Sequence, residues 1–298
     1  MQTQDIYEIF EETCMNFRRD QGIRMAASIA FLSMLSLVPI TIFAIIIGQA
    51  IFSDSALQNE VIPQISTWFG ERAADATRSA FNSASEVTSF TLPAIFSLAL
   101  LAYSASTVFY ELQKALNNVW GVQKDPEEKS FVESLEKRVL AFGLVLLVGT
   151  LIIVLLVSTS IIWGVQQDID NALGGLMLTL VNVAISIGLA FLILILIYKY
   201  IPEVDVNWRV LVPPTLLASI AYIVGLAIVQ FYISNSTTGS IYQALGSVAL
   251  VLIFLFYSAG VLFAGAELSE VYAKRIGAEV EVEQGVKILD EDRLPMPN

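Results

Sequence analysis

Long apolar stretches separated by short polar segments dominate the pattern of this chain. A helix needs about 20 mostly apolar residues to cross the hydrocarbon layer of a membrane, which is about 30 Å thick. Six stretches meet this requirement, and none contains an internal Asp, Lys or Arg. They cover about 26–52, 92–112, 139–165, 173–198, 211–233 and 241–268. The pattern predicts an all-α polytopic integral membrane protein, with a six-helix transmembrane domain over 26–268.

Two segments outside these spans show the spacing of amphipathic helices. Within the N-terminal segment 1–25, residues 5–20 place apolar side chains at helical intervals, namely Ile6, Phe10, Cys14 and Phe17. We expect a short helix there at the cytoplasmic interface. The segment 53–91 repeats apolar residues every four positions and predicts an external helical loop, either a cap packed on the bundle or a lid over a cavity. Residues 269–298 form an acidic tail expected in the cytoplasm, and its part 278–298 predicts a disordered or loosely held segment.

The distribution of Lys and Arg sets the expected orientation. Cytoplasmic loops of membrane proteins carry an excess of Lys and Arg. Of the 16 Lys and Arg residues, 14 fall in the N-terminal segment, the C-terminal tail and every second loop; the exceptions are Arg72 and Arg78. This alternation predicts six spans with both termini in the cytoplasm, in the cytoplasmic (inner) membrane.

Composition narrows the possible functions. Hydrophobic residues make up 56% of the chain and charged residues 15%, and the mean hydropathy is +0.70. The chain has one cysteine, Cys14, no histidine and a net charge of −12. It therefore lacks the commonest metal ligand and general base, a CxxC pair and the basic surface expected of an RNA-binding enzyme. We expect no enzymatic activity, no cofactor, no metal site and no nucleic-acid partner.

Polar residues inside the spans mark a candidate path for a substrate. Such residues are costly in a membrane and usually face the interior of a bundle or a water-filled cavity. Pro39 removes a backbone hydrogen bond and predicts a kink in the first span. The candidate path consists of Ser36, Asn182, Tyr242, Gln243 and Glu267. For Ser36 the alternative is a structural role, because small residues and hydroxyls also hold membrane helices together.

Glu267 is the most informative acid, because it lies late in an apolar span near its expected cytoplasmic end. A carboxylate there needs a cation, water or a proton. By the predicted topology, three cations share this level of the membrane: Arg24, Lys199 and Arg209. One interpretation is a structural ion pair that closes the bundle, and the other is a role in handling substrate or protons.

Several segments carry a resemblance to a known family. They are Ala26–Phe31 leading into Leu35–Pro39, Ala115–Trp120, Tyr200–Pro202 with Trp208 and Arg209, and Gly239–Ser247 with Tyr257 and Gly265–Leu268. Over about residues 5–275 the chain resembles the YihY/virulence factor BrkB family of bacterial inner-membrane proteins, once described as ribonuclease BN. It departs at Leu32, where an aromatic residue is usual, and at Phe254, where many members have tryptophan.

The resemblance implies a six-helix membrane protein that supports envelope integrity or stress resistance. It further implies transport of a lipid, a lipid-linked molecule or a small solute, with membrane lipids as partners. A non-transporting scaffold or partner subunit is the alternative. Pairs of small residues four positions apart, such as Ala26 and Ala30, fit either a monomer or a homo-oligomer and leave room for an envelope partner protein.

Overall fold

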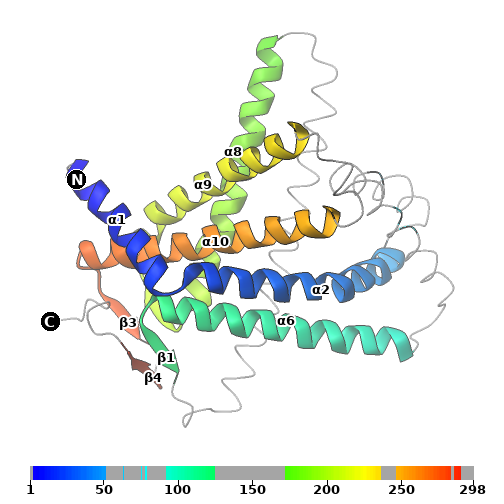
Figure 1. Ribbon diagram of the computed structural model, residues 1–298, viewed down its shortest axis with the longest axis horizontal. Coiled ribbons are helices and arrows are strands. Elements are labelled where there is room, and N and C mark those ends of the chain that lie inside the picture. The colour runs from blue at the N-terminus through cyan, green and yellow to red at the C-terminus, as the bar shows by residue number, and fades with distance from the viewer. Residues whose placement is uncertain are drawn as a thin grey trace. The chain divides into compact units, whose positions relative to one another are not determined.

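The computed structural model describes residues 3–51, 63, 75, 78, 92–124, 172–235, 246–282 and 285–289 (Figure 1). Its helices are α1 (Thr3–Arg19), α2 (Gly22–Ile51), α6 (Leu92–Val119), α8 (Ala172–Tyr200), α9 (Trp208–Asn235) and α10 (Gly246–Arg275). Its strands are β1 (Val122–Lys124), β2 (Val204–Val206), β3 (Val280–Val282) and β4 (Val286–Ile288). The predicted third span, 139–165, and nearly all of the external segment 53–91 lie outside the described residues. The described part is mostly helical.

Three helical stretches among the described residues are long and apolar enough to cross a membrane. They are Gly174–Tyr200, Trp208–Ile228 and Val251–Arg275, with mean hydropathy values of 2.9, 2.0 and 2.0. Gly22–Ser36 is a shorter apolar stretch at the start of α2. The three long stretches match the predicted fourth, fifth and sixth spans, so the prediction of a helical membrane protein is confirmed for them. Gly22–Ser36 covers only part of the predicted first span.

The chain divides into two compact units. The first unit comprises Met1–Ala26, Tyr110–Asn235 and Ser258–Asn298, and the second comprises Ala27–Phe109 and Ser236–Tyr257. The first unit therefore holds α1, α8, α9, the four strands and the C-terminal parts of α6 and α10. The second holds most of α2 and the N-terminal parts of α6 and α10.

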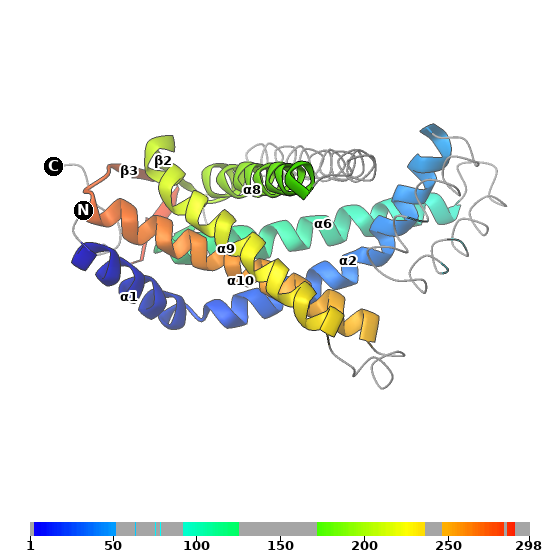
Figure 2. The ribbon, with the colours of Figure 1, turned by 90° about the horizontal axis from the view of Figure 1, so that it is seen from above.

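In the first unit, α8 and α9 pack against each other (Figure 2). The connection between them is short because Asn207 caps the N-terminus of α9, which begins at the next residue, Trp208. Its side-chain Oδ1 accepts a hydrogen bond of 3.0 Å from the backbone N–H of Arg209, and its backbone carbonyl accepts one of 2.9 Å from Val210. An asparagine in this position supplies acceptors for N–H groups that have no partner inside the helix. Pro213 and Pro214 lie inside α9, so the helix begins before the two prolines rather than at them.

The C-terminal tail is ordered over its two strands. Helix α10 ends in a Schellman motif, in which Gly277 has φ 62° and the Ala278 N–H donates to the Ala273 carbonyl at 3.0 Å. Strand β3 then pairs antiparallel with β2, and β4 pairs antiparallel with β1. The expectation of a disordered or loosely held tail is therefore wrong for these residues. In β3 the buried Val280 and the half-buried Val282 flank the exposed Glu281, and in β4 the half-buried Val286 and Ile288 flank the exposed Lys287. The net charge of the segment conceals this alternation.

Helix α1 covers the predicted amphipathic segment but turns a different face inward. Ile9 and Thr13 are buried, whereas Phe10 and Cys14 are exposed. Thr13 satisfies its buried hydroxyl by donating to the Ile9 carbonyl at 2.7 Å. The extent of the helix was thus predictable, and its packed face was not.

Candidate functional site

Two carboxylates lie one turn apart on the C-terminal half of α10. Glu267 and Glu270 are spaced i, i+3, which places them on the same face of the helix, and their residues are 0% and 1% exposed. Between them, the buried Ser269 donates a hydrogen bond of 2.8 Å to the Gly265 carbonyl. Both glutamates fall within the stretch Val251–Arg275 that is apolar enough to cross a membrane. Acids removed from water in such a helix are candidates for handling a substrate or a proton.

Helix α1 packs beside this part of α10. Asn16 donates from Nδ2 to Glu270 Oε2 at 3.2 Å. Towards the end of α10, Arg275 forms an ion pair with Glu8, and Lys274 Nζ lies 3.9 Å from Glu12 Oε1. A hollow of about 610 Å³ lies there, lined by Glu8, Glu11, Glu12, Met15, Asn16, Arg19 and Arg275. Three contacts spread along α1 therefore attach it to the end of α10 next to the buried acids.

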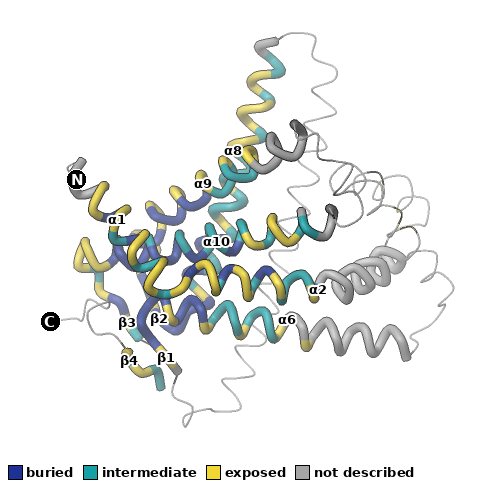
Figure 3. The backbone as a smooth tube through the Cα atoms, viewed as in Figure 1, coloured by how far each residue is buried: buried dark blue, intermediate teal, exposed yellow. Residues whose placement is uncertain are grey.

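A third buried glutamate, Glu203, lies in the connection between α8 and α9. Its Oε2 accepts a hydrogen bond of 2.9 Å from Asn117 Nδ2, and its own backbone N–H donates to Asn117 Oδ1 at 2.9 Å. Gln113, one turn earlier on α6, donates to the Ile201 carbonyl at 3.2 Å. The two side chains of Asn117 and Glu203 thus join the end of α6 to the α8–α9 connection. In Figure 3 the buried residues of this unit gather around the strands and the adjoining helix ends.

Helix α8 meets α10 one turn before Glu267. The buried Tyr198 donates its hydroxyl to the Leu262 carbonyl at 2.8 Å. Gly265 faces this tyrosine so closely that a Cβ atom there would lie 2.3 Å from Tyr198 Oη and 2.7 Å from the Ala218 Cβ. A glycine is therefore required where α8, α9 and α10 come together, and this packing fixes the position of the turn that carries Glu267.

The structure places the predicted path residues as follows. Ser36 is buried in the second unit and donates to the Leu32 carbonyl at 3.0 Å. Asn182 is half-buried in α8, and its Oδ1 has no hydrogen-bond partner among the described residues. Glu267 lies with Asn182 in the first unit, whereas Tyr242 and Gln243 lie outside the described residues. A common path through these five residues stays a prediction.

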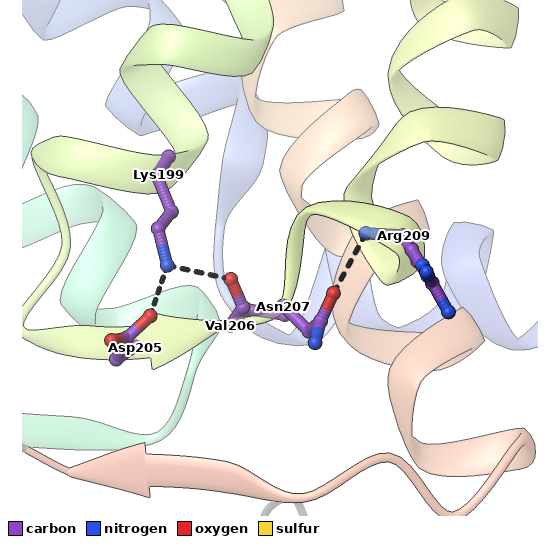
Figure 4. A network of polar contacts seen from close by, with 5 residues as sticks. All are labelled: Lys199, Asp205, Val206, Asn207 and Arg209. Atoms are coloured by element: carbon purple, nitrogen blue, oxygen red, sulfur yellow. Dashed lines mark hydrogen bonds and ion pairs between the residues drawn. The ribbon is translucent and has the colours of Figure 1, made fainter.

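The remaining predicted residues have these positions. Pro39 lies inside α2, which continues through it to Ile51. Lys199 forms an ion pair with Asp205 and donates to the Val206 carbonyl at 2.9 Å (Figure 4). Arg24 and Arg209 are exposed near the starts of α2 and α9. The ion pair of Glu267 with one of the three cations stays a prediction, and the observed partner of Lys199 is Asp205.

Several residues of the site were not singled out from the sequence. Glu203 and Asn117 lie in segments rich in polar residues, where burial cannot be read from the amino-acid type. Glu270 lies two residues beyond the predicted end of the sixth span at 268. The i, i+3 spacing of Glu270 from Glu267 is the signal that could have identified it. Within the part of the chain that the structure describes, no three His, Cys, Asp or Glu side chains are arranged to hold a metal ion.

Comparison with known proteins decides the family. The family model named virulence factor BrkB matches residues 13–287, nearly the whole chain. The chain belongs to the virulence factor BrkB family. No solved structure matches it.

Curated relatives of this BrkB-family chain carry the name UPF0761 membrane protein. One from Tolumonas auensis is 26% identical over 82% of this chain and 78% of its own length. One from Idiomarina loihiensis is 22% identical over 85% of this chain and 86% of its own length. One from Pseudoalteromonas translucida is 25% identical over 84% of this chain and 81% of its own length. The matched range 13–287 includes the contact of α8 with α10 at Gly265 and the buried Glu267.

Proposed function

We propose that this BrkB-family protein moves a lipid, a lipid-linked molecule or a small solute across the cytoplasmic membrane and thereby supports envelope integrity or stress resistance. The proposal includes six spans, both termini in the cytoplasm, and no enzymatic activity or cofactor. The observation that carries it is the pair of fully buried glutamates, Glu267 and Glu270, on one turn of an apolar helix. A membrane protein that binds no substrate and no proton would gain nothing from burying two acids there.

The surroundings of the pair support this proposal. Glu270 is held by the side chain of Asn16, and Glu267 follows the glycine at which α8 and α10 make close contact. A carboxylate held in place by packed helices can bind and release a cationic or hydroxyl-bearing group, or a proton, with little rearrangement of the protein. Glu267 is therefore the proposed contact with the substrate, and Glu270 with Asn16 positions the turn that bears it.

The test is native mass spectrometry of the full chain in a mild detergent, with wild type beside a Gln243→Leu/Glu267→Leu double variant. We expect wild type to retain a specific lipid or lipid-linked species and the double variant to lose at least about tenfold of it, because an ionic hydrogen bond contributes about 1.5–3 kcal/mol. Glu281→Gln, at an exposed strand position, is the matched control and retains the species. Equal, non-selective retention by all three proteins contradicts lipid as the substrate.

A scaffold or partner subunit is the second candidate function. It is favoured by the outward face of α1, on which Tyr7 is 71% and Phe10 65% exposed. If this function holds, Tyr7→Ala/Phe10→Ala abolishes crosslinking to an envelope protein while Glu267→Gln has no effect. The opposite result favours transport.

A further inference from the structure

An uninterrupted stripe of exposed apolar side chains runs along α9 and winds slowly about its axis, because residues four positions apart are offset by about 40°. Its residues are all exposed by 39% or more, namely Trp208, Val212, Leu216, Ile220, Val224 and Ile228. The stripe covers 21 residues. At a rise of 1.5 Å per residue its ends lie about 30 Å apart, which is the thickness of the hydrocarbon layer. In a membrane protein this match identifies the stripe as a face towards lipid, and it puts Trp208 at one edge of the hydrocarbon.

The side chains around Trp208 are those typical of a headgroup region. The Tyr200 ring lies edge-on to the Trp208 ring, with the ring centroids 6.0 Å apart, and both residues are partly exposed. Tryptophan and tyrosine concentrate at the boundary between hydrocarbon and headgroups, where one end of the ring system is apolar and the other is hydrated. Two adjacent helix ends, those of α8 and α9, therefore present aromatic anchors together.

Two cations lie at the same junction, and they differ in how far they are neutralised. Lys199 Nζ lies 5.9 Å from the Trp208 ring centroid, but it is paired with Asp205. Arg209 is exposed, and its guanidinium has no ion pair in the part of the chain that the structure describes. Figure 4 shows its side chain extending away from the Lys199–Asp205 pair. Arg209 thus offers a positive charge beside the aromatic pair, with the planar donor geometry that suits a phosphate group.

We propose that Arg209, with Trp208 and Tyr200, forms a docking surface for the headgroup of an anionic phospholipid at the α8–α9 junction. Hydrocarbon chains lie along the stripe of α9, the aromatic rings lie at the glycerol level, and Arg209 donates hydrogen bonds to the phosphate. Asp205 weakens this surface by neutralising Lys199. The surface does not depend on the proposed transport activity, because it follows from the exposed stripe of α9 and the junction residues and not from the buried glutamates.

The experiment compares retention of phosphatidylglycerol and phosphatidylcholine with identical acyl chains by the purified full chain, using native mass spectrometry. We expect wild type to prefer phosphatidylglycerol and Arg209→Gln to reduce that preference about fivefold, the effect of one surface cation on an anionic lipid. Arg209→Lys restores most of the preference. Asp205→Asn raises it above wild type by releasing Lys199.

Arg18→Gln is the matched control, because Arg18 is an exposed arginine that belongs to α1 and not to the α8–α9 junction. It should leave the preference unchanged. The proposal is overturned if Arg209→Gln behaves as wild type, or if Arg18→Gln lowers the preference equally. It is also overturned if the chain runs as a dimer whose lipid retention is independent of Arg209, since a second copy then covers the stripe.

Discussion

Replacing Gly265 by alanine should destabilise the protein by about 1–3 kcal/mol, the usual cost of an added group in a packed core. The new Cβ would lie 2.3 Å from Tyr198 Oη and 2.7 Å from the Ala218 Cβ, so α10 would have to move away from both α8 and α9. Tyr198 cannot easily give way, because it is buried and its hydroxyl bonds to the Leu262 carbonyl. The measurement is the midpoint of heat-induced loss of the monodisperse peak in size-exclusion chromatography.

The control for this prediction is Gly260→Ala on the same helix. No described residue lies within 4 Å of a Cβ at Gly260, so this variant should be as stable as wild type, or more so by about 0.5–1 kcal/mol through helix propensity. Adding Tyr198→Phe to Gly265→Ala removes the nearest atom and should recover part of the loss. If Gly265→Ala is as stable as Gly260→Ala, the close contact of α8 with α10 is not present in the protein.

Hydropathy predicted the membrane helices because it depends on stretches of about 20 residues, which is the scale of the helices themselves. It could not predict where they end. Helix α6 continues to Val119 and α10 to Arg275, beyond the expected ends at 112 and 268, because packing keeps polar residues helical outside the apolar part. The four strands escaped prediction because each has three residues, too few for an alternating pattern to be recognised.

The candidate site was predictable only in part, for a related reason. Glu267 stood out because it lies in an apolar stretch, where any acid is unusual. Glu203 lies in a polar connection, and its burial depends on Asn117, 86 residues earlier in the chain. One sequence shows the composition of each helix and the spacing of nearby residues. It does not show which distant side chain hydrogen-bonds to an acid and so allows the acid to be buried.

Deleting the tail from residue 278 onwards should lower stability more than any exposed substitution. The tail supplies β3 and β4, which bind the α8–α9 connection and the segment after α6, so its removal exposes Val122, Val204 and Val206. We expect a lower midpoint of thermal unfolding. We also expect protease cleavage at the α8–α9 connection, which mass spectrometry of the fragments detects. Deleting only 290–298, beyond β4, is the control and should leave both unchanged. Equal protease resistance of the two truncations would show that the strands do not hold the connection.

Two single substitutions in β3 separate the contribution of the strand pairing from that of tail length. Val280, which is 3% exposed, lies opposite Val206, so Val280→Asp buries a charge without a partner and should cost more than about 2 kcal/mol. Glu281 instead lies opposite Asp205, and like charges placed directly across two strands repel. Glu281→Lys should therefore stabilise the pairing by about 0.2–1 kcal/mol, reduced by the Lys199 cation already bound to Asp205. A loss of stability from Val280→Asp together with a gain from Glu281→Lys is expected only for this register. A tail that did not pair with β2 would change in stability with neither substitution.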